Sequence, residues 1–491
     1  MEIKHKRSKW PPGTGDYKDC IVIYDDGWND YCYMTLFHMI YCDKKGICNP
    51  IGDVKIYYYD YDEERTKSYG KAVSEVVDNT ISQLGNKFCS LGQSLRYYQK
   101  LKENCPQDYL NILKRLNDIA IFPEIKKCFI NEIGVQKSLL RDSSAEKALK
   151  EASTLIKTNQ LIQKNMSFGY FARVPYNDER IELQFDFEKR DDLPYRINVL
   201  IGKNGTGKTQ ILSSLADSLS GLSSNVFEKK EAFRGERPPV DKVISISYSA
   251  FDEFRKRVSD NNAYLSNSYI YCGIQSEHGT LSLNELNKNY LNALKIIREK
   301  ERLASWRIIM QELLEKEHIA LIEQMQMEDI DRIHWSSGQY ILVCTMTEAV
   351  ANIEKESLLL FDEPELHLHP NAVANTMRMF YRLLEEFDSY AIFATHSPLI
   401  VQEIPAQYVQ ILSRVNNVLT VRKPAMECFG ENITNITNDI FDVSSSESAY
   451  KIILEKLSRE MNFEDILTLF NGNLSFHAMI FLKSCYNKDK E

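Results

Sequence analysis

A phosphate-binding loop near the centre of the chain constrains its fold more than any other feature. Residues 202–209 read G-K-N-G-T-G-K-T, a complete G-x-x-x-x-G-K-T motif. An apolar run at 197–201 precedes the loop, and a segment of helical pattern follows from Gln210 to about Ser220. Strand, loop and helix in this order are the context that the motif requires. The sequence therefore predicts an α/β fold that binds a nucleoside triphosphate here.

Each residue type in the loop has a chemical reason. Glycines let backbone N–H groups point inward at phosphate oxygens, and the next helix adds its positive N-terminal end. Lys208 is predicted to reach the β- and γ-phosphates, and Thr209 to place its hydroxyl on Mg²⁺. The predicted nucleotide-binding residues are Gly202, Lys203, Asn204, Gly205, Thr206, Gly207, Lys208, Thr209 and Gln210.

Composition narrows the class of protein. An apolar fraction of 43% and a charged fraction of 26% indicate a folded chain rather than a disordered one. No uncharged apolar run approaches the roughly 18 residues that span a bilayer, so no membrane partner is expected. The eleven cysteines form no C-x-x-C pair, which favours reduced thiols and a cytoplasmic location. A net charge of −9 argues against a protein coated for nucleic acid and leaves a local basic groove open.

A second motif, at 358–364, places two carboxylates at the end of an apolar strand. Open α/β sheets bind their ligands at the carboxyl ends of their strands. Asp362 is predicted to hold the Mg²⁺ that bridges the β- and γ-phosphates. Glu363 is predicted to polarise the attacking water.

Two further motifs contribute to the same chemistry. Another apolar strand ends at Thr395-His396-Ser397, where His396 is predicted to sense or stabilise the γ-phosphate. Residues 335–339 open a predicted helix with serines and a glycine, whose free N–H groups suit an anion. The predicted anion-binding residues of this helix are Ser336, Ser337, Gly338 and Gln339.

In order and together, the four motifs resemble those of ATP-binding-cassette (ABC) ATPases, and within them the SMC/RecF/OLD branch. Residues 336–339 stand at the family's L-S-G-G-Q signature, with Trp335 replacing leucine and Ser337 replacing glycine. Residues 364–370 match the P-E-x-H-L-H-P extension of that branch. The resemblance covers roughly 165–425. It makes His367 and His369 interface and packing residues rather than metal ligands.

The resemblance implies an α/β ABC-ATPase head, which combines a parallel sheet carrying the phosphate loop with an antiparallel β lobe. It implies ATP and Mg²⁺ as ligands, with Glu363, His396 and Lys208 as catalytic residues. It also implies a homodimer or higher assembly, in which one subunit's loop and its partner's signature helix enclose each ATP. The family's coupling glutamine is not evident, because 248–253 contain none and Gln275 lies further on.

Six segments are predicted along the chain. Residues 1–62 are assigned to the antiparallel β part of the head, and 63–165 to a helical insertion. The phosphate-loop lobe follows at 166–282 and a helical lobe at 283–334. Residues 335–425 complete the ATPase core. Residues 426–491 form a helical extension that is a candidate for partner docking, with packing on the chain's own core as the alternative.

The effector that such an ATPase controls is predicted to lie in another chain. The sequence after His396 contains no D-x-D pair and no H-N-H pattern of the kind that nuclease domains carry. Residues 51–56, 90–94 and 271–273 resemble the PtuA-type ATPases of Septu and retron-linked antiphage systems. That resemblance implies a switch subunit that regulates an HNH nuclease of the PtuB type. A reverse transcriptase with its RNA–DNA is a further partner in the retron systems.

Two other functions stay open at this level. One is a DNA-repair ATPase of the RecF/SMC kind that clamps DNA, which would bind duplex in a salt-sensitive way. The other is a scaffold that does not hydrolyse ATP and uses the bound nucleotide only to hold an assembly together.

Overall fold

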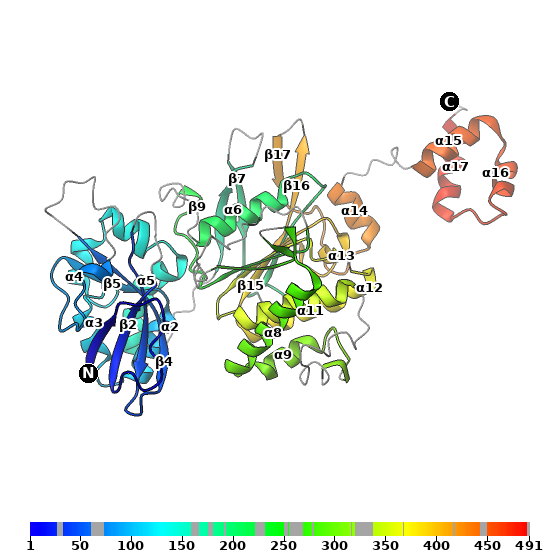
Figure 1. Ribbon diagram of the computed structural model, residues 1–491. Coiled ribbons are helices and arrows are strands. Elements are labelled where there is room, and N and C mark those ends of the chain that lie inside the picture. Colours follow the sequence, from blue (N-terminus) through cyan, green and yellow to red (C-terminus); the bar gives the residue numbers. More distant parts are fainter. Residues whose placement is uncertain are drawn as a thin grey trace.

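The structure is a computed structural model and forms three units (Figure 1). These are an N-terminal α/β unit, a central α/β unit that carries the phosphate loop, and a small C-terminal helical unit. The residues that the structure describes are 1–26, 33–59, 73–158, 166–174, 180–190, 193–220, 231–249, 254, 269–276, 279–315, 317–319, 337–366, 368–415, 418–441 and 449–488.

The N-terminal unit is built on a five-stranded sheet of order β1-β2-β3-β4-β5. Strand β1 runs parallel to β2, and the other neighbours are antiparallel. Strands and helices share one buried core, so they fold as one body. The strands are β1 (Glu2–Lys6), β2 (Cys20–Asp25), β3 (Leu36–Cys42), β4 (Cys48–Tyr58) and β5 (Phe88–Gly92). The helices are α1 (Val73–Val76), α2 (Leu95–Asn104), α3 (Tyr109–Arg115), α4 (Pro123–Phe129), the π-helix Val135–Leu139 and α5 (Ser143–Thr158).

This grouping differs from the expectation that 1–62 belong to the ATPase head and 63–165 form an insertion. The buried side chains of both segments, such as Ile23, Val54 and Leu101, belong to a core that is separate from the cores of the central unit. Strand β5 also lies in the stretch expected to be helical. It pairs with β4, from Val54 opposite Gly92 to Tyr58 opposite Phe88, and such a distant partner leaves no local pattern in the sequence.

The central unit contains a seven-stranded sheet of order β11-β10-β14-β15-β8-β16-β17. All neighbouring strands are parallel except β17, which is antiparallel to β16. The predicted parallel sheet with helical crossovers is therefore confirmed. The strands are β8 (Ile197–Gly202), β10 (Val243–Ser247), β11 (Tyr269–Gly273), β14 (Leu358–Asp362), β15 (Tyr390–Thr395), β16 (Val409–Val415) and β17 (Val418–Arg422).

Both faces of this sheet are covered. One face packs on the helices α8 (Leu283–Glu299), α9 (Leu303–Met310), α11 (Ser337–Asn352) and α12 (Pro370–Glu386). The other packs on α6 (Lys208–Ser220) and on an antiparallel lobe of β6 (Phe168–Ala172), β7 (Ile181–Phe185) and β9 (Phe233–Arg234). A parallel sheet joined to an antiparallel lobe confirms the predicted fold class. The short elements between these are β12 (Gln275–Ser276), β13 (Gly279–Thr280), α13 (Pro398–Val401) and the 3-10 helix Ala406–Tyr408.

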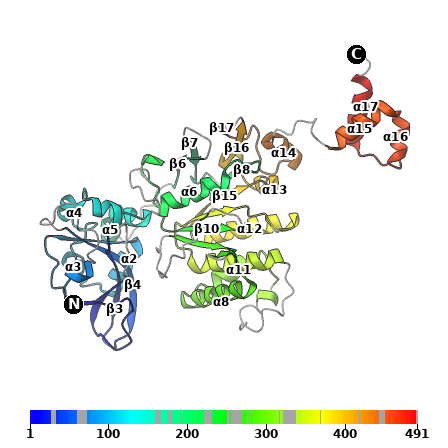
Figure 2. The ribbon, with the colours of Figure 1, turned by 45° about the horizontal axis from the view of Figure 1, so that its top comes forward.

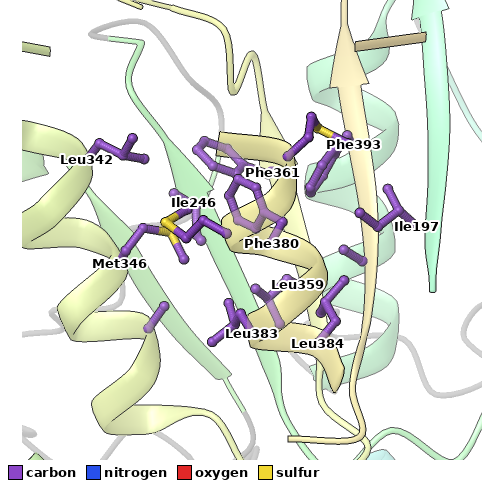
Figure 3. Close-up of a cluster of buried hydrophobic side chains, with 14 of the residues drawn as sticks. Ile197, Ile246, Leu342, Met346, Leu359, Phe361, Phe380, Leu383, Leu384 and Phe393 are labelled. Atoms are coloured by element: carbon purple, nitrogen blue, oxygen red, sulfur yellow. The ribbon is translucent and has the colours of Figure 1, made fainter. Parts of the chain in front are cut away.

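Burial on both faces explains why β14 reads as an unbroken apolar run. Leu359 and Phe361 point to the helical face, whereas Leu358 and Leu360 point to α6 and the antiparallel lobe. Phe361 meets Phe380 of α12 edge to face, with ring centroids 5.3 Å apart (Figure 3). Edge-to-face aromatic pairs add stability beyond the area that they bury. The strand that ends at Asp362 is therefore firmly held.

The expected C-terminal extension, 426–491, divides into two parts. Helix α14 (Ile433–Phe441) places Ile436 and Ile440 in the core of the central unit. Helices α15 (Ala449–Glu460), α16 (Phe463–Leu469) and α17 (Phe476–Lys488) enclose a small core of their own and stand apart in both views (Figures 1 and 2). The docking role expected of this segment stays a prediction.

The N-terminal and central units meet through charged residues. Lys147 of α5 contacts Glu356, and its Nζ lies 3.4 Å from Asp241 Oδ1. Arg96 of α2 reaches Glu354 at 2.5 Å. We call these five residues, Arg96, Lys147, Asp241, Glu354 and Glu356, the charged seam. Nowhere in the described part of the chain is a helix both long and apolar enough to cross a bilayer.

Candidate nucleotide-binding site

The phosphate loop joins the end of β8 to the start of α6, as the sequence predicts. Gly205 and Gly207 have φ angles of +79° and +97°, which side-chain-bearing residues rarely adopt. A Cβ added to Gly202 would lie 2.4 Å from the carbonyl oxygen of Leu412. Three of the loop positions therefore require glycine for steric reasons, and the turn leaves the backbone open to an anion.

Lys208 is buried at the first position of α6. Its Nζ donates to the carbonyl oxygens of Gly202 and Lys203, at 2.9 and 3.2 Å. Burial lowers the pKa of this lysine, and the negative charges of Glu363, Asp362 and Glu365 oppose that shift. The ammonium group thus lies inside the loop, beside carboxylates that come from the other two motifs.

The predicted magnesium ligands come together across two elements. The Thr209 hydroxyl, on α6, donates to Asp362 Oδ2, at the end of β14, at 2.7 Å. The Asp362 side chain is buried at the carboxyl edge of the sheet. Hydroxyl and carboxylate oxygens are the ligands that Mg²⁺ prefers. The residues present therefore fit a magnesium ion beside the phosphate loop.

Glu363 and His396 are also neighbours. Glu363 adopts a left-handed conformation, with φ +53°, and its backbone N–H donates to the Ala394 carbonyl at 2.8 Å. Its Oε1 lies 3.4 Å from Nδ1 of His396, which follows β15. Because β14 and β15 are adjacent parallel strands in register, their ends bring the two predicted catalytic side chains together.

Glu365 is a site residue that was not among the predicted ones. Its Oε1 accepts hydrogen bonds from the Thr395 hydroxyl at 2.5 Å and from the His396 backbone N–H at 3.0 Å. The same oxygen lies 3.3 Å from His396 Nδ1. The signal in the sequence is its place directly after Pro364 in the extension motif, which by itself indicates the family resemblance and not a contact with His396.

The predicted signature residues lie elsewhere in the chain. Ser336 is outside the described residues, and α11 begins at Ser337 with a buried Gly338 and an exposed Gln339. Helix α11 packs on β11, and β10, β14 and β15 separate that strand from β8. Four steps of strand spacing amount to roughly 19 Å. The role expected of these signature residues in nucleotide binding stays a prediction.

The interface and packing roles expected of His367 and His369 stay predictions. His369 is exposed, and His367 lies outside the described residues. No group of three potential ligands able to hold a metal ion occurs within the described ranges. Gln275 is buried, and its Nε2 donates to the carbonyl oxygen of Ser249, which follows β10, at 3.0 Å.

The sheet order, the antiparallel lobe and the contact between the phosphate loop and the end of β14 define an α/β fold of the P-loop nucleotide-binding type. Residues 334–402 match a family described as "AAA domain, putative AbiEii toxin, Type IV TA system". The matched stretch contains the predicted signature, the Asp362–Glu363 pair and His396.

Full-length similarity is found to a phage protein. The chain is 28% identical over 504 residues to Protein ea59 of Escherichia phage lambda, which covers 95% of this chain and 94% of that protein. Among solved structures it is similar to cbiO1 of Clostridium perfringens, part of the ABC transporter complex cbiONQ, with 12% identity and a TM-score of 0.31 over 63% of this chain and 100% of that one. MJ1267, an ATP-binding cassette of an ABC transporter in its ADP conformation, gives 12% identity and a TM-score of 0.30, over 56% and 94%.

Proposed function

We propose that this protein is an ATP-hydrolysing switch subunit of a bacterial antiphage defence complex. The observation that carries the ATPase proposal is the contact between Thr209 and Asp362 beside the buried Lys208. It brings two separate motifs into one place with the ligand types that Mg·ATP requires. Glu363 and His396, on neighbouring strand ends, supply the groups for hydrolysis.

The proposed reaction is attack of water on the γ-phosphorus, with cleavage of the bond to the bridging oxygen to give ADP and phosphate. The N–H groups of residues 203–208 and the Lys208 ammonium offset the charge of the phosphates. Thr209 and Asp362 would hold Mg²⁺, which when bound neutralises charge on the β- and γ-oxygens. Glu363 accepts a proton from the attacking water, and His396 donates to a γ-phosphate oxygen.

We propose that the working unit is a homodimer around ATP. Helix α11 packs on β11, and three strands separate β11 from β8 and its phosphate loop, which supports a site completed by a second copy. In a two-fold assembly the same surface then serves both sites. ATP binding closes the interface and hydrolysis loosens it, because the nucleotide is part of the contact.

The proposed output is control of a separate nuclease in the cytoplasm, of the HNH type, with a reverse transcriptase and its RNA–DNA as a further partner. A family described as a toxin of a type IV toxin–antitoxin system supports a role in conflict between bacteria and phages. Similarity to a phage protein along almost the whole chain supports the same setting.

The decisive experiment is Glu363→Gln, which keeps the shape of the side chain and removes the base. ATP turnover should fall by about 10²- to 10⁴-fold, as expected for loss of a general base, while ATP binding is kept. Size-exclusion chromatography with light scattering should then show an ATP-dependent dimer that persists. Glu385→Gln, an exposed site on α12 64% accessible, is the matched control and should behave as wild type.

The alternatives give different results. If the wild type shows no ATP turnover, and Glu363→Gln retains nucleotide and assembles as the wild type does, only the scaffold function would remain. Salt-sensitive binding of duplex DNA by the purified protein would favour the DNA-clamping function. Absence of both ATP turnover and ATP-dependent association in the wild type would end the switch proposal.

A further inference from the structure

Two turns meet at the carboxyl edge of the central sheet. One follows β14 and contains Glu363 and Glu365, and the Leu366 N–H donates to the Glu363 carbonyl to close it. The other follows β15 and contains Thr395 and His396. Glu365 joins the two, because its Oε1 receives both the Thr395 hydroxyl and the His396 N–H.

Holding this turn does not consume the whole Glu365 carboxylate. The side chain is only 9% exposed, and its other oxygen, Oε2, makes no hydrogen bond with any described residue. Neutral acceptors would satisfy the Thr395 hydroxyl and the His396 N–H equally well. A buried negative charge is costly, so its presence here calls for a role beyond accepting these two hydrogen bonds.

The His396 imidazole lies between two carboxylates at nearly equal distances. Nδ1 is 3.3 Å from Glu365 Oε1 and 3.4 Å from Glu363 Oε1. If Glu363 alone faced the ring, the imidazole would pair with it and occupy the oxygen that must accept a proton from water. A second carboxylate at the same distance divides the attraction.

We propose that Glu365 is a positioning residue that competes with Glu363 for His396 and so keeps the Glu363 carboxylate available to the attacking water. The proposal rests on the proposed ATPase function and deepens it. Glu365 does not touch the reacting atoms in this role. It acts only through the position of the His396 ring.

A purely structural role predicts a different outcome from the positioning role. Gln at position 365 keeps an oxygen for Thr395 and for the His396 N–H, and removes only the charge. If Glu365 merely holds the turn, Gln should serve almost as well. If its charge draws His396 away from Glu363, Gln should slow hydrolysis without weakening nucleotide binding.

The test is a double-mutant cycle of Glu365→Gln and His396→Ala, with kcat, KM and the Kd of a fluorescent ATP analogue measured for each protein. Glu365→Gln alone should lower kcat about tenfold, the effect of one charge-assisted contact, with Kd within about twofold of wild type. In the His396→Ala background the same substitution should change kcat by less than about twofold, because the ring through which Glu365 acts is gone.

Glu385→Gln is the matched control for loss of one carboxylate and should leave kcat and Kd unchanged. Wild-type kcat in Glu365→Gln, or the same loss in both backgrounds, would overturn the proposal. If Glu365→Gln does not fold, Glu365→Asp replaces it, since the shorter side chain withdraws the charge from His396 and should show the same non-additivity. Absence of ATP turnover in the wild type would refute the ATPase function itself, whereas turnover that requires Glu363 but ignores Glu365 refutes only this inference.

Discussion

The charged seam and the nucleotide site are both clusters of ionic side chains, and they differ in balance. At the seam, Glu354 is met by Arg96 at 2.5 Å and by its neighbours in the central unit, Lys300 and Arg302, at 3.1 and 2.9 Å. Lys147 faces Glu356 and Asp241. In the nucleotide site, the negative charges of Asp362, Glu363 and Glu365 act on the ammonium of Lys208. Opposite charges are matched in the seam, whereas negative charge is in surplus at the site. A matched cluster holds a structure together, and an unmatched one is suited to a ligand of the missing sign.

The pKa shifts express the same contrast. Burial would raise the pKa of Glu354, but Lys300, Arg302, Lys242 and Arg96 outweigh it and hold the pKa below its usual value. At the site, the carboxylates only oppose the effect of burial, which keeps the pKa of Lys208 lowered. The seam therefore stabilises the charged form of Glu354. At the site, the nearby carboxylates do not fully offset the effect of burial on the charged form of Lys208.

The two clusters lie at opposite ends of the same strands. Strands β10 and β14 begin at Val243 and Leu358, next to Asp241 and Glu356 of the seam. Strand β14 ends at Asp362, which contacts Thr209 of the phosphate loop, and β10 ends opposite it at Ser247. Five residues of strand span about 16 Å. The N-terminal unit is thus mounted on the far ends of the strands that carry the nucleotide site.

The largest expected effect is at the site. Lys208→Ala removes the ammonium that lies inside the phosphate loop near three carboxylates, so the phosphates of ATP would face those carboxylates without it. ATP affinity should fall by about a thousandfold, a loss of roughly 4 kcal/mol of binding free energy. Titration of a fluorescent ATP analogue measures this, with the exposed Lys288→Ala as control. Unchanged affinity would contradict the assignment of the surplus charge to ligand binding.

The corresponding change in the seam should act on stability instead. Glu354→Ala leaves Arg96, Lys300 and Arg302 without their shared partner in a place where Glu354 is only 22% exposed. Breaking a largely buried ion cluster from one side costs about 3 kcal/mol. Urea unfolding should show this loss, while kcat per folded molecule stays within about twofold of wild type. A loss of turnover in Glu354→Ala at unchanged stability would contradict the assignment of a stabilising role to the seam.

The sequence could predict the nucleotide site but not the seam. Each site motif is local: Gly202, Asp362 and His396 each end an apolar strand, and parallel strands bring their ends to one edge. Arg96 and Glu354 are 258 positions apart, and neither lies in a sequence motif that predicts contact with the other. Strand β5 was missed for a similar reason, because its partner β4 lies about thirty residues upstream. Glu365 belongs to a motif that the sequence shows. Its contact with Thr395 and His396 could not be predicted, because it depends on the register of β14 against β15.

A pH effect should arise beside the seam. Burial lowers the pKa of Lys242 to about 8, against the pull of Glu354, and Lys300, Arg302 and Arg96 lower it further. The folded state then binds fewer protons than the unfolded state between about pH 8 and the ordinary lysine value of 10.5, so stability should rise with pH in that window. Between pH 7.5 and 9.5 the wild type should gain about 1–2 kcal/mol relative to Lys242→Met, as measured by urea unfolding. Parallel pH curves for the two proteins would refute this.

Removal of one of the three carboxylates of the nucleotide site should have little effect on the free energy of unfolding. In Glu363→Gln, relief of repulsion from Asp362 and Glu365 offsets the lost attraction to Lys208 and His396. The free energy of unfolding without nucleotide should stay within about 1 kcal/mol of wild type, although turnover is lost. Urea unfolding beside Glu354→Ala makes the contrast direct. A loss as large as that of Glu354→Ala would mean that the site is a structural cluster like the seam.

The smallest effect is expected at the rim of the seam. Arg96 is 49% exposed, so water and salt screen its contact with Glu354, and Lys300 and Arg302 still neutralise that carboxylate when Arg96 is replaced. Arg96→Ala should therefore cost no more than about 0.5–1 kcal/mol. The difference should shrink as salt rises from about 50 mM to about 0.5 M, because screening becomes stronger over that range. Urea unfolding at both salt concentrations measures it. A larger loss that resists salt would place Arg96 at the centre of the seam, because its contact with Glu354 would then behave as a buried one. The N-terminal unit would in that case be fixed to the central unit.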